Sequence, residues 1–146
     1  MNVAHLLREV AQPFSMKPQD TAIDAVRNMI DFDTGAIAVL GDDRKCVGIF
    51  SKKDLLGKVV ALDRDAKTTR LGDVMTTDIV TAANHLTVEE CMRLMVEYRV
   101  RHLVLVDTDG RYTGLLGLCD ILGDRIFELT QSLLNLEGYL NDAPGG

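Results

Sequence analysis

The residues whose types and spacing suit ligand binding gather in one short stretch, Gly48 to Asp54, which reads Gly-Ile-Phe-Ser-Lys-Lys-Asp. Its apolar residues predict the end of a buried strand, and Ser51 three residues before Asp54 predicts a helix start. A carboxylate can accept hydrogen bonds from both hydroxyls of a ribose, and such charge-assisted bonds are about twice as strong as neutral ones. Free N–H groups at a helix start favour a phosphate. The stretch therefore predicts a sugar-phosphate site.

The same stretch occurs again 66 positions later. Gly114 to Asp120 reads Gly-Leu-Leu-Gly-Leu-Cys-Asp and keeps the first glycine, the two apolar residues and the final aspartate. The alignment extends on both sides without a gap and pairs Thr21 with Thr87, Arg27 with Arg93, Met29 with Met95, Asp43 with Asp109, Leu56 with Leu122 and Gly57 with Gly123. A repeat at fixed spacing indicates a duplicated unit.

The composition limits the possible classes of function. The chain has 146 residues, of which 47% are hydrophobic. Two independent halves of about 60 residues would each be marginally stable, so we expect the halves to pack on each other. A formal net charge of −6 argues against a nucleic-acid surface, because phosphate contacts need clustered Lys and Arg. Two locally basic spots are of interest as a possible pocket: Lys52 with Lys53, and the run from Arg99 to His102.

The cysteines and the hydropathy pattern predict the cellular setting. Cys46, Cys91 and Cys119 fall inside apolar patterns and read as reduced interior residues. They form no CxxC pair and no metal-ligand spacing with the histidines, so no metal site is expected. Without a signal-like start or an apolar run of about 18 residues, we expect a soluble, cytoplasmic protein with no membrane partner.

Each unit is predicted to contain a strand, a helix, two strands joined by a tight turn, and a closing helix. Thr21 and Thr87 begin capping boxes for the first helices, and a tight turn follows the second strand of each unit. The predicted fold class is therefore α/β in an α+β arrangement. The repeat divides the chain into a helix and lead-in over 1–13, a first unit over 14–60, a linker over 61–79, a second unit over 80–126, and a helical extension with a tail over 127–146.

The second closing helix is predicted to continue well past the repeat. Ile126, Leu129, Leu133, Leu136 and Leu140 recur every three or four residues. Such a stripe packs on its own domain or forms a dimer contact, and we predict a homodimer.

Taken in order, these features resemble the tandem cystathionine-β-synthase-type domain, called a CBS pair or Bateman module. The resemblance covers both units and depends on the duplicated β-α-β-β-α order, the glycine-apolar-apolar-(Ser/Thr)-x-x-Asp motif, the tight turns, and Arg101-His102 before a strand. It implies two units in pseudo-two-fold tandem, with two clefts between them for adenosine-containing ligands: AMP, ADP, ATP, NAD or S-adenosylmethionine. The motif aspartate then holds the ribose.

The resemblance also implies the residues of each cleft. The better cleft takes Ile49, Ser51, Lys53 and Asp54 from the first unit and Thr81, Asn84, Val100, Arg101 and His102 from the second. The other takes Ser15, Gly35 and Ala36 from the first unit and Leu115 and Asp120 from the second. This second cleft is expected to be weaker, because Gly117 replaces the hydroxyl and no basic residue stands at Gly35 or Ala36.

Both motifs have a structural alternative. Ser51 and Asp54 form a capping box by themselves, so both could serve only to start a helix. Arg101 and His102 stand before an apolar strand, where a solvated edge is the default explanation.

The residue pattern contains no nucleophile with a base, no paired carboxylates and no metal set that would indicate catalysis. We therefore expect a stand-alone regulatory protein, not an enzyme, that senses an energy or metabolite ligand and acts on an unidentified effector protein. The alternative is a ligand-free module for dimerisation or partner docking.

Overall fold

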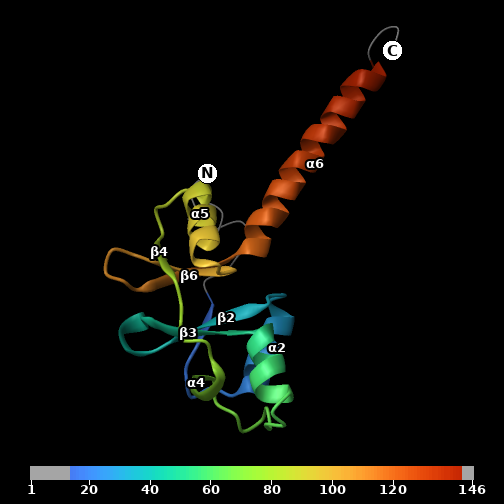
Figure 1. The fold of residues 1–146 in the computed structure, drawn as a ribbon. Helices are drawn as coiled ribbons and strands as arrows, with labels where there is room; N and C mark the ends of the chain where they lie inside the picture. Colours follow the sequence, from blue (N-terminus) through green and yellow to red (C-terminus); the bar gives the residue numbers. More distant parts are fainter. Residues whose placement is uncertain (1–13, 143–146) are drawn as a thin grey trace.

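The computed structural model describes residues 14–142, without the side chains of 124–128 and 139–142. Two similar units stack on each other, and one long helix leaves the second unit and points away from the body (Figure 1). The lead-in helix predicted over 1–13 lies outside the described residues.

The first unit is a three-stranded sheet with helices on one side. Its elements are β1 (Ser15–Met16), α2 (Ala22–Asp31), β2 (Ala36–Leu40), the 3-10 turn η1 (Asp42–Arg44), β3 (Cys46–Ser51), α3 (Lys52–Asp54) and the π-helical segment η2 (Leu55–Val60). β1 runs parallel to the central strand β2, and β3 runs antiparallel to it. The connection between β2 and β3 takes two residues into the left-handed region, at Asp43 and Arg44.

The second unit repeats this plan. Its elements are β4 (Thr81–Ala83), α5 (Val88–Tyr98), β5 (His102–Val106), β6 (Tyr112–Gly117) and α6 (Leu118–Asp142). The sheet order is again lead-in strand, central strand, hairpin partner. β5 and β6 lie 66 residues after β2 and β3 at both ends, which is the spacing of the sequence repeat. The predicted mixed α+β fold of two β-α-β-β-α units is therefore confirmed.

The first helix of each unit begins at the predicted threonine. In α5, the Thr87 hydroxyl accepts a hydrogen bond from the Glu90 N–H at 3.1 Å, and the Glu90 carboxylate accepts from the Thr87 N–H at 3.3 Å, which completes a capping box. In α2 only the hydroxyl half is present, with the Asp24 N–H donating to Thr21 at 3.4 Å. The Asp24 carboxylate instead lies 3.7 Å from the Arg27 guanidinium. The predicted first box is therefore incomplete.

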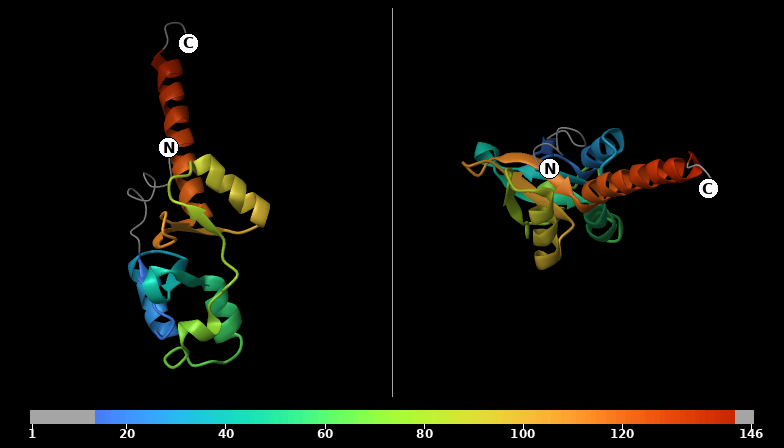
Figure 2. Two further views of the ribbon diagram at one scale, coloured as in Figure 1. Left: turned by 90° about the vertical axis from the view of Figure 1, so that its left-hand side faces the viewer. Right: turned by 90° about the horizontal axis from the view of Figure 1, so that it is seen from above.

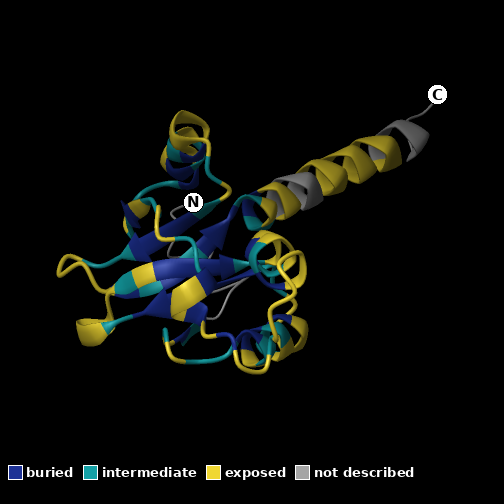
Figure 3. Ribbon diagram, turned by 60° about the horizontal axis from the view of Figure 1, so that its bottom comes forward, coloured by how far each residue is buried: buried dark blue, intermediate teal, exposed yellow. Residues whose placement is uncertain are grey.

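The central strand β2 is buried on both of its faces. Because side chains alternate along a strand, Ile37 and Val39 pack with α2 and Phe50 in the core of the first unit. The alternate residues Ala36, Ala38 and Leu40 face the second unit and join Val104, Tyr112 and Ile49 in a separate cluster between the two sheets. Figure 3 shows this buried centre in dark blue. The halves therefore share a core, as expected from their small size.

The second half of the predicted linker packs on the first unit. α4 (Leu71–Val74) places two fully buried side chains, Leu71 and Val74, in the core of the first unit. Thr76 then pairs with Ile49 at the edge of β3 through two backbone hydrogen bonds of 2.8 and 2.9 Å. The linker therefore extends the first sheet before it enters the second unit.

Beyond its first turns, α6 projects away from both units, and two further views confirm this (Figure 2). Its leucines at 129, 133 and 136 are more than half exposed. They do not pack on their own domain, which was one of the two alternatives for the stripe. None of the helices among the described residues is long and apolar enough to span a membrane.

A glycine at position 48 is required by the linker that lies against β3. A Cβ added to Gly48 would lie 2.6 Å from the Met75 sulfur and 2.9 Å from the Thr76 carbonyl oxygen. We expect Gly48→Ala to lower the free energy of unfolding by about 1–3 kcal/mol, because a backbone atom must move. Chemical denaturation of the purified variant measures this.

Gly57→Ala is the matched control, because a Cβ there meets no atom within 4 Å. It should leave the free energy of unfolding unchanged or raise it by up to about 1 kcal/mol, as alanine favours a helix over glycine. Equal stability of the two variants would contradict the close approach of the linker.

Candidate ligand-binding site

Each unit carries its predicted motif where the third strand turns into the closing helix. At the first junction, the Asp54 carboxylate turns back onto the start of its own helix. Its Oδ2 accepts hydrogen bonds from the Ser51 N–H at 3.0 Å and the Ser51 hydroxyl at 3.1 Å. Ser51 Oγ in turn accepts from the Asp54 N–H at 3.3 Å. The capping box, foreseen as the structural alternative, is therefore formed.

The other carboxylate oxygen of Asp54 is occupied as well. Oδ1 accepts a hydrogen bond from the Thr76 hydroxyl at 2.8 Å and lies 3.0 Å from the Lys58 ammonium. Asp54 is only 4% exposed. The predicted ribose-binding role of Asp54 stays a prediction, and a ligand at this junction would first have to displace Thr76 or Lys58.

The charge of Asp54 is stabilised by these partners. Burial, the largest single influence, would raise the pKa of the carboxyl, but Lys58, Thr76 and Ser51 together lower that pKa below its ordinary value of 3.8. Asp54 therefore stays ionised over the neutral pH range and holds the linker at Thr76 against the closing helix.

The sequence prediction did not include two of these partners, Lys58 and Thr76. A local pattern could have indicated the first but not the second. Lys58 stands four residues after Asp54 on a helix, which is a recognisable ion-pair spacing. Thr76 lies 22 residues away across the linker. No local pattern indicates that contact.

The second junction leaves its carboxylate much less engaged. The Gly117 N–H donates to Asp120 Oδ2 at 3.0 Å, which is the only half of a capping box that glycine permits. Asp120 is half-buried, and no other hydrogen bond or ion pair of this carboxylate is present among the described residues. A Cβ at position 117 would lie 3.0 Å from that same oxygen. The glycine therefore allows the Asp120 carboxylate to lie this close to the strand end.

Two basic residues of the second unit, Arg101 and His102, stand at the start of β5 beside this second junction. His102 pairs with Gly117 across the β5–β6 hairpin, and its ring carbon Cδ2 lies 3.5 Å from where a Cβ of Gly117 would stand. Burial lowers the pKa of His102, nearby Asp120 raises it, Arg101 lowers it, and the net pKa is below the usual 6.5. The Arg101 carbonyl accepts from the Leu118 N–H at 2.8 Å, and Arg101 is itself exposed.

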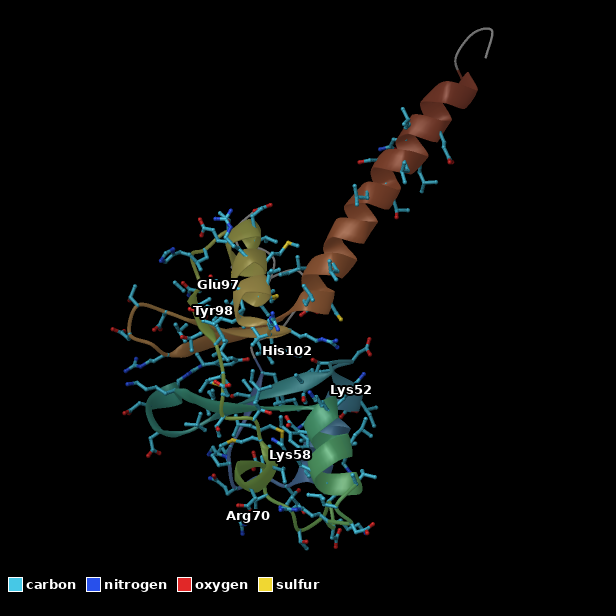
Figure 4. All side chains as sticks on the ribbon, in the orientation of Figure 1. Lys52, Lys58, Arg70, Glu97, Tyr98 and His102 are labelled. Atoms are coloured by element: carbon cyan, nitrogen blue, oxygen red, sulfur yellow. The ribbon has the colours of Figure 1, made fainter. Side chains whose placement is uncertain are left out.

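Arg101 and His102 were predicted to join Asp54 in one cleft, and this grouping stays a prediction. Among the described residues, the His102 ring lies near Asp120 of its own unit, and the Arg101 carbonyl accepts from Leu118 next to it. Figure 4 shows His102 in the second unit and Lys58 in the first, below it. The physical reason is the antiparallel hairpin, which sets the start of one strand beside the end of its partner.

The first unit shows the same local arrangement. Gly35 and Ala36 were expected beside Asp120, but Ala36 pairs with Ser51, and the Lys52 N–H donates to the Gly35 carbonyl at 3.0 Å. A Cβ added at Gly35 would lie 3.6 Å from the Lys52 side chain. Lys52 is thus the basic residue next to this strand start, and both Lys52 and the predicted Lys53 are exposed.

The remaining predicted residues spread over both sheets. Ile49 and Leu115 lie at the cluster between the sheets, Thr81 and Asn84 lie on and just after β4, and Val100 packs against the core of the second unit. Ser15, on β1, lines an open hollow of about 480 Å³ together with Asp20, Asp24 and Asp31. Carboxylates predominate in that hollow, so it does not suit a phosphate.

Comparison with known proteins identifies the fold family. A family model described as the CBS domain matches residues 5–61 and again 71–125. The chain belongs to the CBS-domain family. Among curated relatives, the CBS domain-containing protein CBSX3, mitochondrial, from Arabidopsis thaliana is 30% identical over 125 residues. The match covers 83% of this chain, which spans only 60% of the length of that relative.

Solved CBS-domain structures superpose on most of the chain. The CBS domain NE2398 is 35% identical with a TM-score of 0.75, over 86% of this chain and 98% of that one. CBSX2 in complex with AMP is 25% identical with a TM-score of 0.63, over 78% and 87% of the two chains. The predicted resemblance to a CBS pair is thus confirmed, while the predicted cytoplasmic location stays a prediction.

The different environments of the two motif aspartates predict different effects on stability. We expect Asp54→Asn to lower the free energy of unfolding at pH 7 by about 1–3 kcal/mol, because the amide cannot accept from all the donors that surround it. Asp120→Asn is the matched control and should cost less than about 1 kcal/mol, since its amide oxygen can still accept from Gly117. Urea unfolding measures both.

The effect of Asp54→Asn should depend on pH. Because the pKa of Asp54 is lower in the folded chain, its charge stabilises the fold above its ordinary pKa of 3.8 and loses that effect as the pH falls through the folded value. The stability gap between wild type and Asp54→Asn should therefore close below about pH 4. A gap that persists unchanged at lower pH would contradict the ionised pair.

Proposed function

We propose that this CBS pair binds an adenosine nucleotide and that the Asp120 junction of the second unit holds its ribose and phosphate. The observation that carries the proposal is the contrast between the two motif aspartates. Both oxygens of Asp54 are occupied within the protein, whereas Asp120 accepts one hydrogen bond and is half-buried beside two basic residues.

The chemistry at Asp120 suits a ribose. The carboxylate is fixed by the Gly117 N–H through Oδ2, so its remaining acceptor positions can take both hydroxyls of the sugar. Because Gly117 has no side chain, the Asp120 carboxylate and the His102 ring both lie close to the backbone here and can contact the same ligand.

The phosphate of the nucleotide then meets Arg101 and His102. Arg101 is exposed at the start of β5 and can form a bidentate pair with phosphate oxygens. His102 has a pKa below its usual value, so at neutral pH it is uncharged and contributes an N–H donor, not a full charge. Arg101 is therefore the residue that neutralises the ligand.

The comparisons support the choice of ligand class. CBSX2, which resembles this chain over most of its length, was solved in complex with AMP. AMP is accordingly the first ligand to test, and ADP, ATP, NAD and S-adenosylmethionine share the adenosine that the site would recognise.

We infer a regulatory role and not a catalytic one. A ligand at this junction can favour one relative arrangement of the two units, as long as its affinity differs between those arrangements. The shared cluster between the sheets gives such an arrangement a physical basis, because small movements there alter the packing of both units.

Calorimetric titration of the full chain with AMP tests the proposal. We expect a Kd between about 1 μM and 1 mM for the wild type. Asp120→Ala and Arg101→Ala should each raise the Kd by about tenfold or more, because each removes a charged partner of the ligand. Thermal shifts with ADP, ATP, NAD and S-adenosylmethionine rank the other ligands, since a bound ligand raises the melting temperature.

Asp109→Ala supplies a matched control. This exposed carboxylate belongs to the same unit but lies in the β5–β6 turn, at the opposite end of the hairpin from Asp120, so its loss should leave the Kd unchanged. Strong loss of binding in a folded Asp54 variant, with none in Asp120→Ala, would move the site to the first junction. Absence of any nucleotide effect would favour a ligand-free docking module instead.

A further inference from the structure

The carboxylate of Asp54 at the first junction has every acceptor position filled by the protein. An ionised carboxylate offers about four such positions, two on each oxygen. Oδ2 accepts from the N–H and the hydroxyl of Ser51. Oδ1 accepts from the Thr76 hydroxyl at 2.8 Å and pairs with the Lys58 ammonium at 3.0 Å. A ligand therefore binds this carboxylate only by replacing one of these partners.

Thr76 is the partner that a ribose would replace. Its hydroxyl is a secondary alcohol, like both free hydroxyls of the ribose in a nucleotide, and it donates to Asp54 as they would. Ser51 belongs to the same capping box as Asp54, and Lys58 is a cation that favours an anionic ligand. Of these three partners, Thr76 is the one that comes from the linker. The linker thus supplies an internal substitute for the sugar.

The backbone of the linker holds this hydroxyl in place. Thr76 pairs with Ile49 at the edge of β3 through two bonds of 2.8 and 2.9 Å. The preceding Met75 carbonyl accepts from the Lys58 ammonium at 3.4 Å. A ribose ring is larger than the hydroxyl that it would replace, and Asp54 is buried. The linker segment therefore has to move off β3 to admit the ring.

The same segment runs directly into the contact between the two units. Ile79 packs against the cluster between the sheets, and the Val80 carbonyl accepts from the Val104 N–H of β5 at 2.9 Å. Three residues span at most about 11 Å, so Thr76 and Ile79 are joined by a short tether. A movement of Thr76 is therefore passed on to the packing of the two sheets.

We propose that Thr76 gates the first junction: an adenosine nucleotide binds there by exchanging the Thr76 hydroxyl for a ribose hydroxyl, and this exchange releases the linker from β3. The gate requires the ligand class of the proposed function but not the Asp120 site. The held linker and the released linker are the two states between which the ligand selects. The gate belongs to the first unit, because the second closing helix continues as α6 and does not turn into a linker (Figure 1).

Calorimetric titration with AMP in an Asp120→Ala background tests the gate, because this background removes the ligand contact proposed for the second unit. Adding Thr76→Ala should lower the Kd for AMP by about tenfold, since an acceptor position on a charged group becomes free. Adding Thr76→Ser, which keeps the hydroxyl, should leave the Kd unchanged. Thr77→Ala, at the next and exposed linker position, is the matched control and should also leave it unchanged.

Amide hydrogen exchange measures the gate without altering the linker. In the Asp120→Ala chain, saturating AMP should speed the exchange of the Ile49 and Thr76 amides by about tenfold or more, because their mutual hydrogen bonds open when the linker is released. The Lys52 amide bonds to the Gly35 carbonyl on the β2 side of the same strand end. Its exchange should not become faster.

The outcomes separate the gate from the proposed function. A folded Asp120→Ala, Thr76→Ala chain that binds AMP no better than Asp120→Ala would overturn the gate and leave the Asp120 site standing. If Thr76→Ala does not fold, unchanged exchange at Ile49 and Thr76 under saturating AMP would overturn the gate instead. Full affinity in Asp120→Ala would remove only the Asp120 site, whereas no AMP binding in any variant would remove both.

Discussion

The fold depends on the burial of its central strands on both faces. Alternate residues of β2 belong to different cores, with Ile37 and Val39 covered by the helix of their own unit and Ala36 and Ala38 covered by the other sheet. A unit of about 60 residues buries too little surface to be stable alone. Each unit therefore supplies the cover that the other lacks, and the small alanine side chains let the two sheets approach closely.

The packing of the two units on each other also determines how the two strand-to-helix junctions differ. The linker leaves the first unit by pairing with the edge of β3 at Ile49, which brings the Thr76 hydroxyl onto Asp54. Among the described residues, nothing equivalent reaches Asp120, so the same motif has a structural task in one unit and an unfilled acceptor in the other. The repeated motif thus gives two strand-to-helix junctions with different chemistry.

The sequence was sufficient for the fold because the repeat fixes each element twice, and Thr21 and Thr87 mark the helix starts independently. The site was harder to predict. The proximity of His102 to Asp120 follows from the hairpin register, which strand pairing alone could have supplied. The contact of Thr76 with Asp54 depends on where a linker settles after both units have folded, and no periodicity in the chain encodes that. The sequence also did not indicate where the linker gives way to α4, because the first half of the linker is polar.

The hydrogen bond from Tyr112 Oη to the Phe14 carbonyl, 2.9 Å long, joins residues 98 positions apart. At the roughly 5–20 residues per second at which a ribosome extends the chain, the apolar outer face of β2 is exposed for roughly 4–14 seconds before the hairpin strand that carries Tyr112 is made. Because positions 36 and 38 are alanine, the apolar surface that is exposed during this interval is small. A nascent chain with leucine or phenylalanine at these positions would expose a larger apolar patch to other proteins before the second sheet is made and covers it.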